Sequence, residues 1–287
     1  MTILAPLRGV TTRLFRETFA EEIAEAGFDE AVTPFISAMH GVDPLADDEL
    51  FSGSRSGGLK ITPQFIGKDP ESLRRCLERV KDAGFDTADF NCGCPFPMVR
   101  NKGRGSGMLR TPDVLRRMLD VGCGTMGAER FSVKARIGVD RPDELLGLMP
   151  LLNEYPLRFL AVHPRTARQM YSGECDSAAF AAVAAEARMP VVRNGDVPLS
   201  AIGDGREHIM IGRAFLRDLG ARRDSRKLLG RYAAALRKKL CGPRPVLGAV
   251  KELASYWKAA EPWSRLWNVL KMCRTLDELD SVLAMSL

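Results

Sequence analysis

The residue with the most distinctive chemistry in this chain is Cys94, which lies in the segment Asn-Cys-Gly-Cys-Pro at residues 91–95. Residues 87–90 alternate polar and apolar side chains, which predicts a β-strand, and the glycine and proline that follow end any regular element. A thiol is therefore placed at the exit of a strand. Because the carboxyl ends of strands carry the chemistry in parallel α/β proteins, we interpret Cys94 as catalytic rather than as a small packing residue, and Cys92 as structural.

A basic, glycine-rich segment follows the cysteine and carries Lys102 and Arg104. Residues 103–107 do not match the phosphate-binding pattern G-x-x-x-x-G-K-[ST], so we expect a mobile substrate loop. Thr111 is then expected to cap a helix, with Pro112 at its first position.

Polar side chains stand at the ends of several other predicted strands. Burying polar groups without partners is costly, so a ring of them at one end of a sheet is better explained by a bound ligand. Gly195 and Gly212 fall where barrel proteins bind phosphate through backbone N–H groups, which suggests a phosphorylated cofactor across the barrel mouth. The ring comprises Arg8, Gly9, Gln64, Asn91, Cys94, Lys134, Arg136, His163, Arg165, Asn194, Gly195, Asp196, Gly212 and Arg213.

Two members of this ring carry the more specific predictions. A lysine inside an apolar strand is hard to explain by packing, and Lys134 could stabilise negative charge on a redox ring. A lone histidine is usually a satisfied core residue, and only the other strand-end groups make His163 a predicted ligand. Gln64 and Asn91 could hydrogen-bond the amide edge of the same ring.

Eight predicted strands alternate with helices and would position these residues. The strands are expected at residues 3–7, 30–36, 59–66, 87–91, 131–137, 159–163, 191–194 and 208–212. This α/β alternation over about 215 residues predicts a (β/α)8 TIM barrel, and the lack of G-x-G-x-x-G after the first strand disfavours a doubly wound sheet. Helices are expected at residues 14–26, 70–83, 112–121, 142–153 and 178–187, while residues 198–206 are too few for a full helix.

The alternation ends after Arg213. We predict a catalytic domain over residues 1–220 and a small all-helical domain over residues 221–287, with helices at 226–240, 245–259, 262–273 and 276–285. Between residues 213 and 274 the chain has sixteen lysines and arginines and only four acidic residues, which gives a local excess of positive charge. Aromatic residues are interleaved with them. This pattern fits an RNA-binding surface, and it equally fits a solvated helical face with tryptophans in the core.

Composition is that of an ordinary globular protein, with 287 residues of which 45% are hydrophobic and 27% charged. The sequence has no apolar run of about 18 residues, so no membrane span is predicted. The first residues do not resemble a signal peptide, and we expect a cytoplasmic protein. Seven irregularly spaced cysteines argue against a disulfide framework, and an isolated C-x-C predicts no metal site. The net charge of +6 permits a polyanionic partner. We also expect the protein to be a monomer.

Six blocks of the chain together resemble the tRNA-dihydrouridine synthases. They occur in the family's order across roughly residues 3–215, and six ordered blocks are far more specific than a lone motif. The blocks are residues 5–11 (APLRGVT), 91–95 (NCGCP) with 103–107, 132–138 (SVKARIG), 162–166 (VHPRT) with 171–173 (YSG), 194–196 (NGD) and 210–213 (MIGR).

The resemblance implies an FMN-dependent enzyme that uses NADPH to reduce uridines in tRNA to 5,6-dihydrouridine. Hydride would reach C6 of the uracil from reduced flavin, and Cys94 would protonate C5. Lys134 and His163 would be catalytic groups that also contact FMN, and Asn91 would lie at both the flavin and the uracil edge. The other implied FMN contacts are Pro6, Leu7, Gln64, Asn194, Gly195, Asp196, Gly212 and Arg213, and the other implied RNA contacts are Lys102, Arg104, Arg136, Arg165, Lys238 and Lys239.

Two features depart from the family pattern. Pro164 replaces a frequent glycine beside His163, and the connection between Asp196 and Ile209 is short. Three alternative hypotheses remain open: the same chemistry on ribosomal RNA, an RNA-binding protein without activity, and an FMN reductase of a small pyrimidine or enone. In the RNA hypotheses with activity, the target base must be flipped out of its stack.

Overall fold

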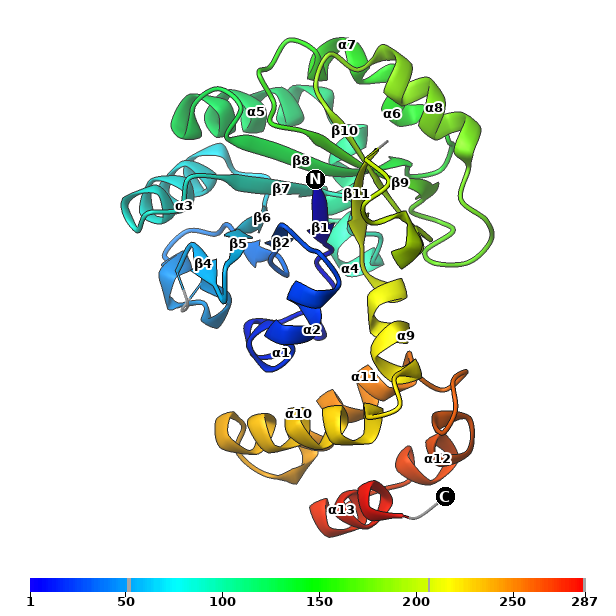
Figure 1. Ribbon diagram of the computed structural model, residues 1–287. Coiled ribbons are helices and arrows are strands. Elements are labelled where there is room, and N and C mark those ends of the chain that lie inside the picture. Colours follow the sequence, from blue (N-terminus) through cyan, green and yellow to red (C-terminus); the bar gives the residue numbers. More distant parts are fainter. Residues whose placement is uncertain (51–52, 206, 286–287) are drawn as a thin grey trace.

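The computed structural model describes residues 1–50, 53–205 and 207–285, and the first part of the chain forms a curled parallel sheet surrounded by helices (Figure 1). This confirms the predicted TIM barrel. Six predicted strands appear as single strands: β1 (Thr2–Leu4), β7 (Ala88–Cys92), β8 (Phe131–Gly138), β9 (Leu160–Thr166), β10 (Val191–Asn194) and β11 (His208–Ile211).

The other two predicted strands are divided near a proline. Pro34 lies between β2 (Glu30–Val32) and β3 (Ile36–Ser37), and Pro63 separates β5 (Leu59–Thr62) from β6 (Gln64–Ile66). Proline has no N–H to donate to the ladder, which accounts for an interruption at these positions. Since β2 pairs with β5 and β3 pairs with β6, the halves still form two neighbouring staves of the barrel. The short β4 (Arg55–Ser56) adds an antiparallel partner to β5.

Strand β1 closes the ring. It pairs with β11, with Thr2 opposite Ile209, and with β2, with Ile3 opposite Glu30. Strands β6 to β11 pair successively. Because all these pairs are parallel, the carboxyl ends of the strands meet at one end of the barrel, where a TIM barrel carries its site.

The barrel's longest outer helices are α3 (Pro70–Asp82), α5 (Pro112–Met126) and α8 (Ser177–Glu186). The side chains of Asp69 and Asp176 cap α3 and α8 by accepting hydrogen bonds from backbone N–H groups. Thr111 stands at the N-cap position of α5, but its hydroxyl bonds the carbonyl of Met108 instead. Thr111 is thus the N-cap residue of α5 as predicted, although its side chain does not cap the helix, and Pro112 begins the helix.

Two predicted helices each break into two short ones. The expected helix over 14–26 becomes α1 (Arg13–Thr18) and α2 (Ala20–Glu25), because Phe19 between them leaves helical geometry (φ −109°, ψ 29°). The expected helix over 142–153 becomes α6 (Glu144–Gly147) and α7 (Met149–Leu152). Five further short helical segments are α4 (Pro97–Arg100), η1 (Pro44–Ala46), η2 (Asp48–Leu50), η3 (Gly105–Arg110) and η4 (Leu199–Ala201). As expected, η4 is less than a full helix; Arg206 of that connection lies outside the described residues.

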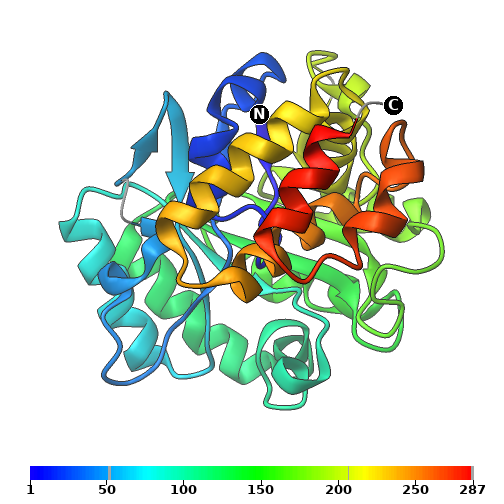
Figure 2. The same cartoon turned by 90° about the horizontal axis from the view of Figure 1, so that it is seen from below.

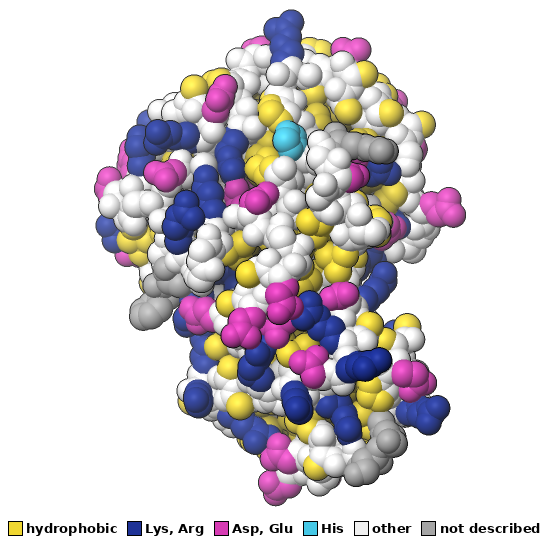
Figure 3. All heavy atoms as spheres, in the orientation of Figure 1, with side chains coloured by type: hydrophobic (Ala, Val, Ile, Leu, Met, Phe, Trp, Pro, Cys, Tyr) yellow, Lys and Arg dark blue, Asp and Glu magenta, His cyan; other side chains and the backbone are white. Residues whose placement is uncertain are grey.

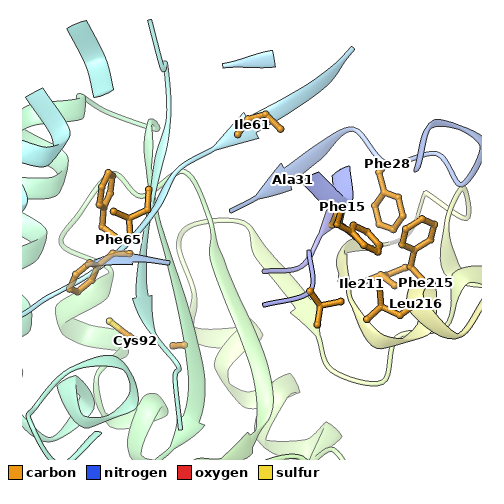
Figure 4. Packing of buried hydrophobic residues seen from close by; sticks show 14 of the residues in the cluster. Phe15, Phe28, Ala31, Ile61, Phe65, Cys92, Ile211, Phe215 and Leu216 are labelled. Atoms are coloured by element: carbon orange, nitrogen blue, oxygen red, sulfur yellow. The ribbon is translucent and has the colours of Figure 1, made fainter. Parts of the chain in front are cut away.

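The hydrophobic core has two parts. A smaller cluster fills the barrel interior with side chains such as Ile3, Phe159 and Met210. A larger cluster lies between the strands and the helices, where Figure 4 shows Phe15, Phe28 and Phe215 packed together. Buried apolar side chains of this size are the main stabilising contribution of the fold.

The chain after β11 is entirely helical: α9 (Arg213–Ala221), α10 (Ser225–Lys239), α11 (Pro243–Ser255), α12 (Trp263–Leu270) and α13 (Leu276–Ala284). The sequence did not predict α9, which continues directly from β11. Figures 1 and 2 show these helices lying together below one end of the barrel. Within residues 1–50, 53–205 and 207–285, no helix combines the length and hydrophobicity needed to cross a membrane.

Candidate active site

A cavity of about 1000 Å³ lies between the carboxyl ends of the barrel strands and the helical part of the chain. The helical part contributes Arg217, Glu252, Ser255, Tyr256, Lys258 and Ala259 to its walls. Most predicted site residues line the same cavity: Pro6, Leu7, Gln64, Asn91, Cys94, Lys134, Arg136, His163, Asn194, Gly195, Asp196, Gly212 and Arg213. Lys102, Arg104, Arg165, Lys238 and Lys239 do not.

Cys94 follows β7 and is 7% exposed. Burial raises the pKa of its thiol, so the sulfur is protonated in neutral solution. The carbonyl of Cys94 accepts hydrogen bonds from the Ser106 N–H (3.1 Å) and hydroxyl (2.9 Å), and a Cβ on Gly105 would come within 2.7 Å of the Cys94 Cβ. The glycine-rich segment thus includes a buried helical turn packed against the cysteine, rather than the free loop that the sequence suggested.

Gln64 and Asn91 form a chain of hydrogen bonds beside Cys94. Gln64 Nε2 donates to Asp89 (2.8 Å), and Asn91 Nδ2 donates to Gln64 Oε1 (2.8 Å). Asn91 Oδ1 accepts the backbone N–H groups of Gly93 (3.0 Å) and Cys94 (2.9 Å). The two amides therefore face the cavity in fixed orientations.

Lys134 lies in the middle of β8, with its side chain in the wall of the cavity. Among the described residues its ammonium group has no hydrogen-bond or ion-pair partner. Burial, and then the charge of Arg136, lower the pKa of Lys134 to about 8. A cation that the protein leaves without a partner is suited to bind a negative or polar ligand atom.

His163 of β9 is 6% exposed, and its Nδ1 is buried without a hydrogen-bond partner among the described residues. Burial, followed by the charges of Arg136 and Lys134, holds the pKa of His163 far below its usual range. The imidazole is thus neutral. Gly195, at φ +103°, lies against the ring, and a Cβ there would come within 3.0 Å of it.

The end of β10 and the start of α9 form a polar corner. Asp196, which has a positive φ of 50°, accepts hydrogen bonds from Arg213 (2.6 Å) and Arg165. Its carboxylate is therefore occupied by two arginines, and the backbone remains its main contribution to a ligand site. Gly212 caps the N-terminus of α9, where backbone N–H groups favour an anion.

Arg136 and Arg165 make hydrogen bonds to the protein itself, and Arg136 also lines the cavity. Arg136 donates to the carbonyls of Gly93 (3.0 Å), Thr166 (3.0 Å) and Met170 (2.7 Å). Arg165, 3% exposed, donates to the carbonyls of Ser172 and Gly173 as well as to Asp196. These arginines tie the loops around the cavity together.

Sequence reasoning assigned no role to Tyr171. The guanidinium groups of Arg136 (5.3 Å) and Arg213 (5.2 Å) lie over its ring, which is edge-on to His163 (6.4 Å). The tyrosine is 44% exposed and lines the cavity. Its presence in the family-like segment YSG was a signal, but nothing in the spacing indicated this stacking.

The helical part carries many cations on its surface, as Figure 3 shows for one face. Some are paired, including Lys239 with Asp48 and Arg237 with Asp280 (2.7 Å). Lys238 is exposed. Trp257 and Trp263 are fully buried and stack edge to face at 5.2 Å, so the core interpretation holds for these tryptophans. No group of three or more potential metal ligands occurs in the described ranges.

The fold and site together define a parallel barrel with a cavity at the carboxyl ends of its strands, and cations outnumber carboxylates in the walls of this cavity. Residues 3–218 match the family model described as "Dihydrouridine synthase (Dus)", and the chain belongs to this family. It is 30% identical over 198 residues to tRNA-dihydrouridine synthase B of Vibrio cholerae, covering 68% of this chain and 59% of that protein. It is 28% identical over 229 residues to tRNA-dihydrouridine(16) synthase of Shigella flexneri, covering 75% and 71%.

Solved structures confirm the fold at low sequence identity. The old yellow enzyme homologue of Zymomonas mobilis matches with a TM-score of 0.53 and 14% identity, over 75% of this chain and 85% of that one. The structure of morphinone reductase in complex with tetrahydroNAD matches with a TM-score of 0.52 and 14% identity, over 85% of this chain and 89% of that one.

Proposed function

We propose that the protein reduces uridines in tRNA to 5,6-dihydrouridine, with FMN as cofactor and NADPH as reductant. The observation that carries this proposal is one cavity containing a protonated thiol, a cation with no partner among the described residues and a neutral histidine, in a chain of the dihydrouridine synthase family. The relatives named for tRNA support the choice of RNA.

The cavity residues fit a flavin mononucleotide. Among the described residues, no group bonds the buried Nδ1 of His163 or the ammonium group of Lys134, so both can face a polar ring. Gly195 and Gly212 line the cavity and have no side chain, so their backbone is open to close approach by a ligand. The N-terminus of α9 would hold the phosphate through backbone N–H groups, together with Arg213. When bound and reduced by NADPH, FMN supplies the hydride that C6 of the uracil receives.

Cys94 is proposed as the acid that delivers a proton from Sγ to C5 of the uracil. An acid must carry its proton at the working pH, and burial raises the thiol pKa in the required direction. The hydrogen bonds from Ser106 and to Asn91 hold the backbone of Cys94 at the cavity wall. Cys92, the last residue of β7, is completely buried and does not line the cavity, so it cannot replace Cys94.

Lys134 and His163 would stabilise and orient the reacting rings. The Lys134 ammonium would balance negative charge that develops on a uracil carbonyl or on the flavin ring. The neutral imidazole of His163 can donate one hydrogen bond and accept another without adding a charge. The second N–H of Asn91 is available to a carbonyl oxygen, because only one is used by Gln64.

The substrate would be a base turned out of its RNA stack, since the cavity is walled by the barrel and by the helical part of the chain. We infer that residues 1–220 act as the catalytic domain and residues 221–287 as an RNA-binding domain, of which residues 286 and 287 lie outside the described structure. Exposed cations such as Lys238, and Lys102 beside the cysteine segment, would contact phosphates.

A half-reaction distinguishes this proposal from its alternatives. The FMN-loaded protein is reduced anaerobically and mixed with unmodified tRNA, ribosomal RNA, free uridine or cyclohexenone, while flavin absorbance is followed. Fastest reoxidation by tRNA supports the proposal, whereas ribosomal RNA, or a small pyrimidine or enone, reacting fastest would redirect it. Failure to bind FMN while binding RNA would favour the RNA-binding protein without activity.

A further inference from the structure

Asp89 is a buried carboxylate that no part of the proposed chemistry uses. It lies in β7 with no exposed surface and does not line the cavity. Burial raises its pKa to about 7, while hydrogen bonds from Ser132 and Gln64 and the charge of Lys134 favour the ionised form. Burying an ionised carboxyl costs free energy unless hydrogen bonds compensate for the lost water. The partners of Asp89 therefore indicate what this residue does.

The hydrogen bonds of Asp89 lead to Cys94. Its Oδ1 accepts from the Ser132 hydroxyl (2.6 Å), and its Oδ2 accepts from Gln64 Nε2 (2.8 Å). From Gln64 the chain continues through Asn91 to the backbone N–H of Cys94.

The groups at the two ends of this series of hydrogen bonds require the same donor-to-acceptor direction along it. Above about pH 7 Asp89 is ionised, and a carboxylate only accepts hydrogen bonds, so the NH₂ group of Gln64 must then face Asp89. Backbone N–H groups only donate, so the Asn91 oxygen must face Gly93 and Cys94. In this arrangement each amide retains a second N–H that no described residue accepts, and both amides line the cavity.

We propose that Asp89 is a positioning residue, which acts through Gln64 and Asn91 to hold the backbone of Cys94 in place and to turn two amide N–H groups toward the bound rings. The inference rests on the proposed function, because Cys94 is the acid of that reaction. The geometry itself, however, can be tested without flavin or RNA.

An exchange of groups tests the link between Asp89 and Gln64. The variant Gln64→Glu places two carboxylates face to face, and neither can donate when ionised. Adding Asp89→Asn supplies a donor on the other side, while the glutamate still accepts from Asn91. The double variant therefore restores the series of hydrogen bonds, with residue 89 now donating to residue 64 instead of accepting from it.

The measurement is the rate at which iodoacetamide alkylates Cys94 in the protein without flavin, followed by peptide mass spectrometry. Exposed Cys241 serves as the reference within each sample. We expect alkylation of Cys94 to be about fivefold faster in Gln64→Glu, the change expected from losing one net hydrogen bond. In the double variant it should return to within about twofold of the original rate by the same reasoning.

Asp86→Asn combined with Gln64→Glu is the matched control, because Asp86 is an exposed carboxyl just before the same strand. It should not restore the rate. If Gln64→Glu does not fold, recovery of a folded protein only in the Asp89 double variant supports the same link. The proposal is overturned if Gln64→Glu alkylates at the original rate, or if the Asp89 and Asp86 double variants behave alike.

Uridine reduction then separates the two proposals. With FMN, NADPH and unmodified tRNA, Gln64→Glu should lower kcat by about tenfold, and Asp89→Asn in the same chain should recover part of it. Absence of uridine reduction in the unaltered protein would remove the proposed function, but it would leave the alkylation result, and hence the role of Asp89, to be judged by itself.

Discussion

At the scale of single residues, burial gives the three proposed reactive groups different protonation states. It raises the pKa of the Cys94 thiol and lowers the pKa values of Lys134 and His163. The result near neutral pH is a protonated acid, a largely cationic lysine and a neutral imidazole in one cavity. Perturbed groups that converge in this way are typical of reaction sites.

Cys94→Ala should leave FMN bound and slow uridine reduction by about 10²- to 10⁴-fold, the usual contribution of a positioned acid. The alanine keeps the backbone hydrogen bonds of residue 94 but supplies no proton. Flavin content and single-turnover reduction of unmodified tRNA measure the two effects. Turnover equal to that of the unaltered protein would exclude Cys94 as the acid.

Activity should fall as pH rises through about 8, because Lys134 loses its charge there. The pKa of Lys134 is lowered, so the cationic form predominates below this value and is lost above it. The Lys134→Arg variant stays charged across this range and should show lower activity without the alkaline decline. A pH profile of kcat/KM for tRNA measures both, and an identical alkaline decline in the variant would contradict the assignment.

At the scale of elements, strand periodicity predicted the barrel and brought together most of the site. Polar residues near strand ends such as Asn91 and Asn194 do meet in one cavity, because parallel strands share their carboxyl edge. The sequence could not show that the donors of Arg136 and Arg165 are taken by loop carbonyls, since those contacts depend on tertiary geometry. For the same reason the stacking of Tyr171 was missed.

Local breaks were also beyond the sequence patterns. Apolar periodicity continues through residue 19, so it predicted one helix where the backbone forms α1 and α2. The alternation of strands and helices ends after Arg213, so the sequence pattern did not predict α9. The apolar side chains of this helix, Phe215, Leu216 and Leu219, are nevertheless fully buried.

The contact between α5 and β8 gives a prediction at this scale. A Cβ on Gly122 of α5 would come within 2.1 Å of the Phe131 ring, so Gly122→Ala should lower the stability by about 1–3 kcal/mol through overpacking. Gly124→Ala, in the same helix with no heavy atom within 4 Å of the added Cβ, should be neutral or stabilising. Urea unfolding compares them, and equal midpoints would contradict the packing argument.

At the scale of the whole molecule, the helical part is fixed to the barrel by packing and by ion pairs. Tyr232 of α10 contacts the rings of Phe15 (6.2 Å) and Phe19 (5.6 Å), and Arg222 pairs with Glu25 (2.9 Å). Gly220 of α9 lies directly under Trp257. The helices and the barrel can therefore present a continuous surface to an RNA.

The proposed RNA surface predicts a salt effect. Lys238→Ala should weaken tRNA binding and reduce the slope of log K against log salt by about 0.7–0.9, the value for one lost phosphate contact. Arg188→Ala removes an exposed cation just before β10, at the opposite end of the barrel, and should leave the slope unchanged. Equal slopes for both variants and the unaltered protein would remove Lys238 from the interface.

The most direct test of the account is nucleoside mass spectrometry of tRNA that lacks dihydrouridine, after incubation with the protein, FMN and NADPH. The account predicts that specific uridines gain two hydrogens, that omitting NADPH prevents the gain, and that replacing Cys94 with alanine greatly slows it. Unchanged uridine in tRNA, with FMN bound and NADPH present, would contradict it.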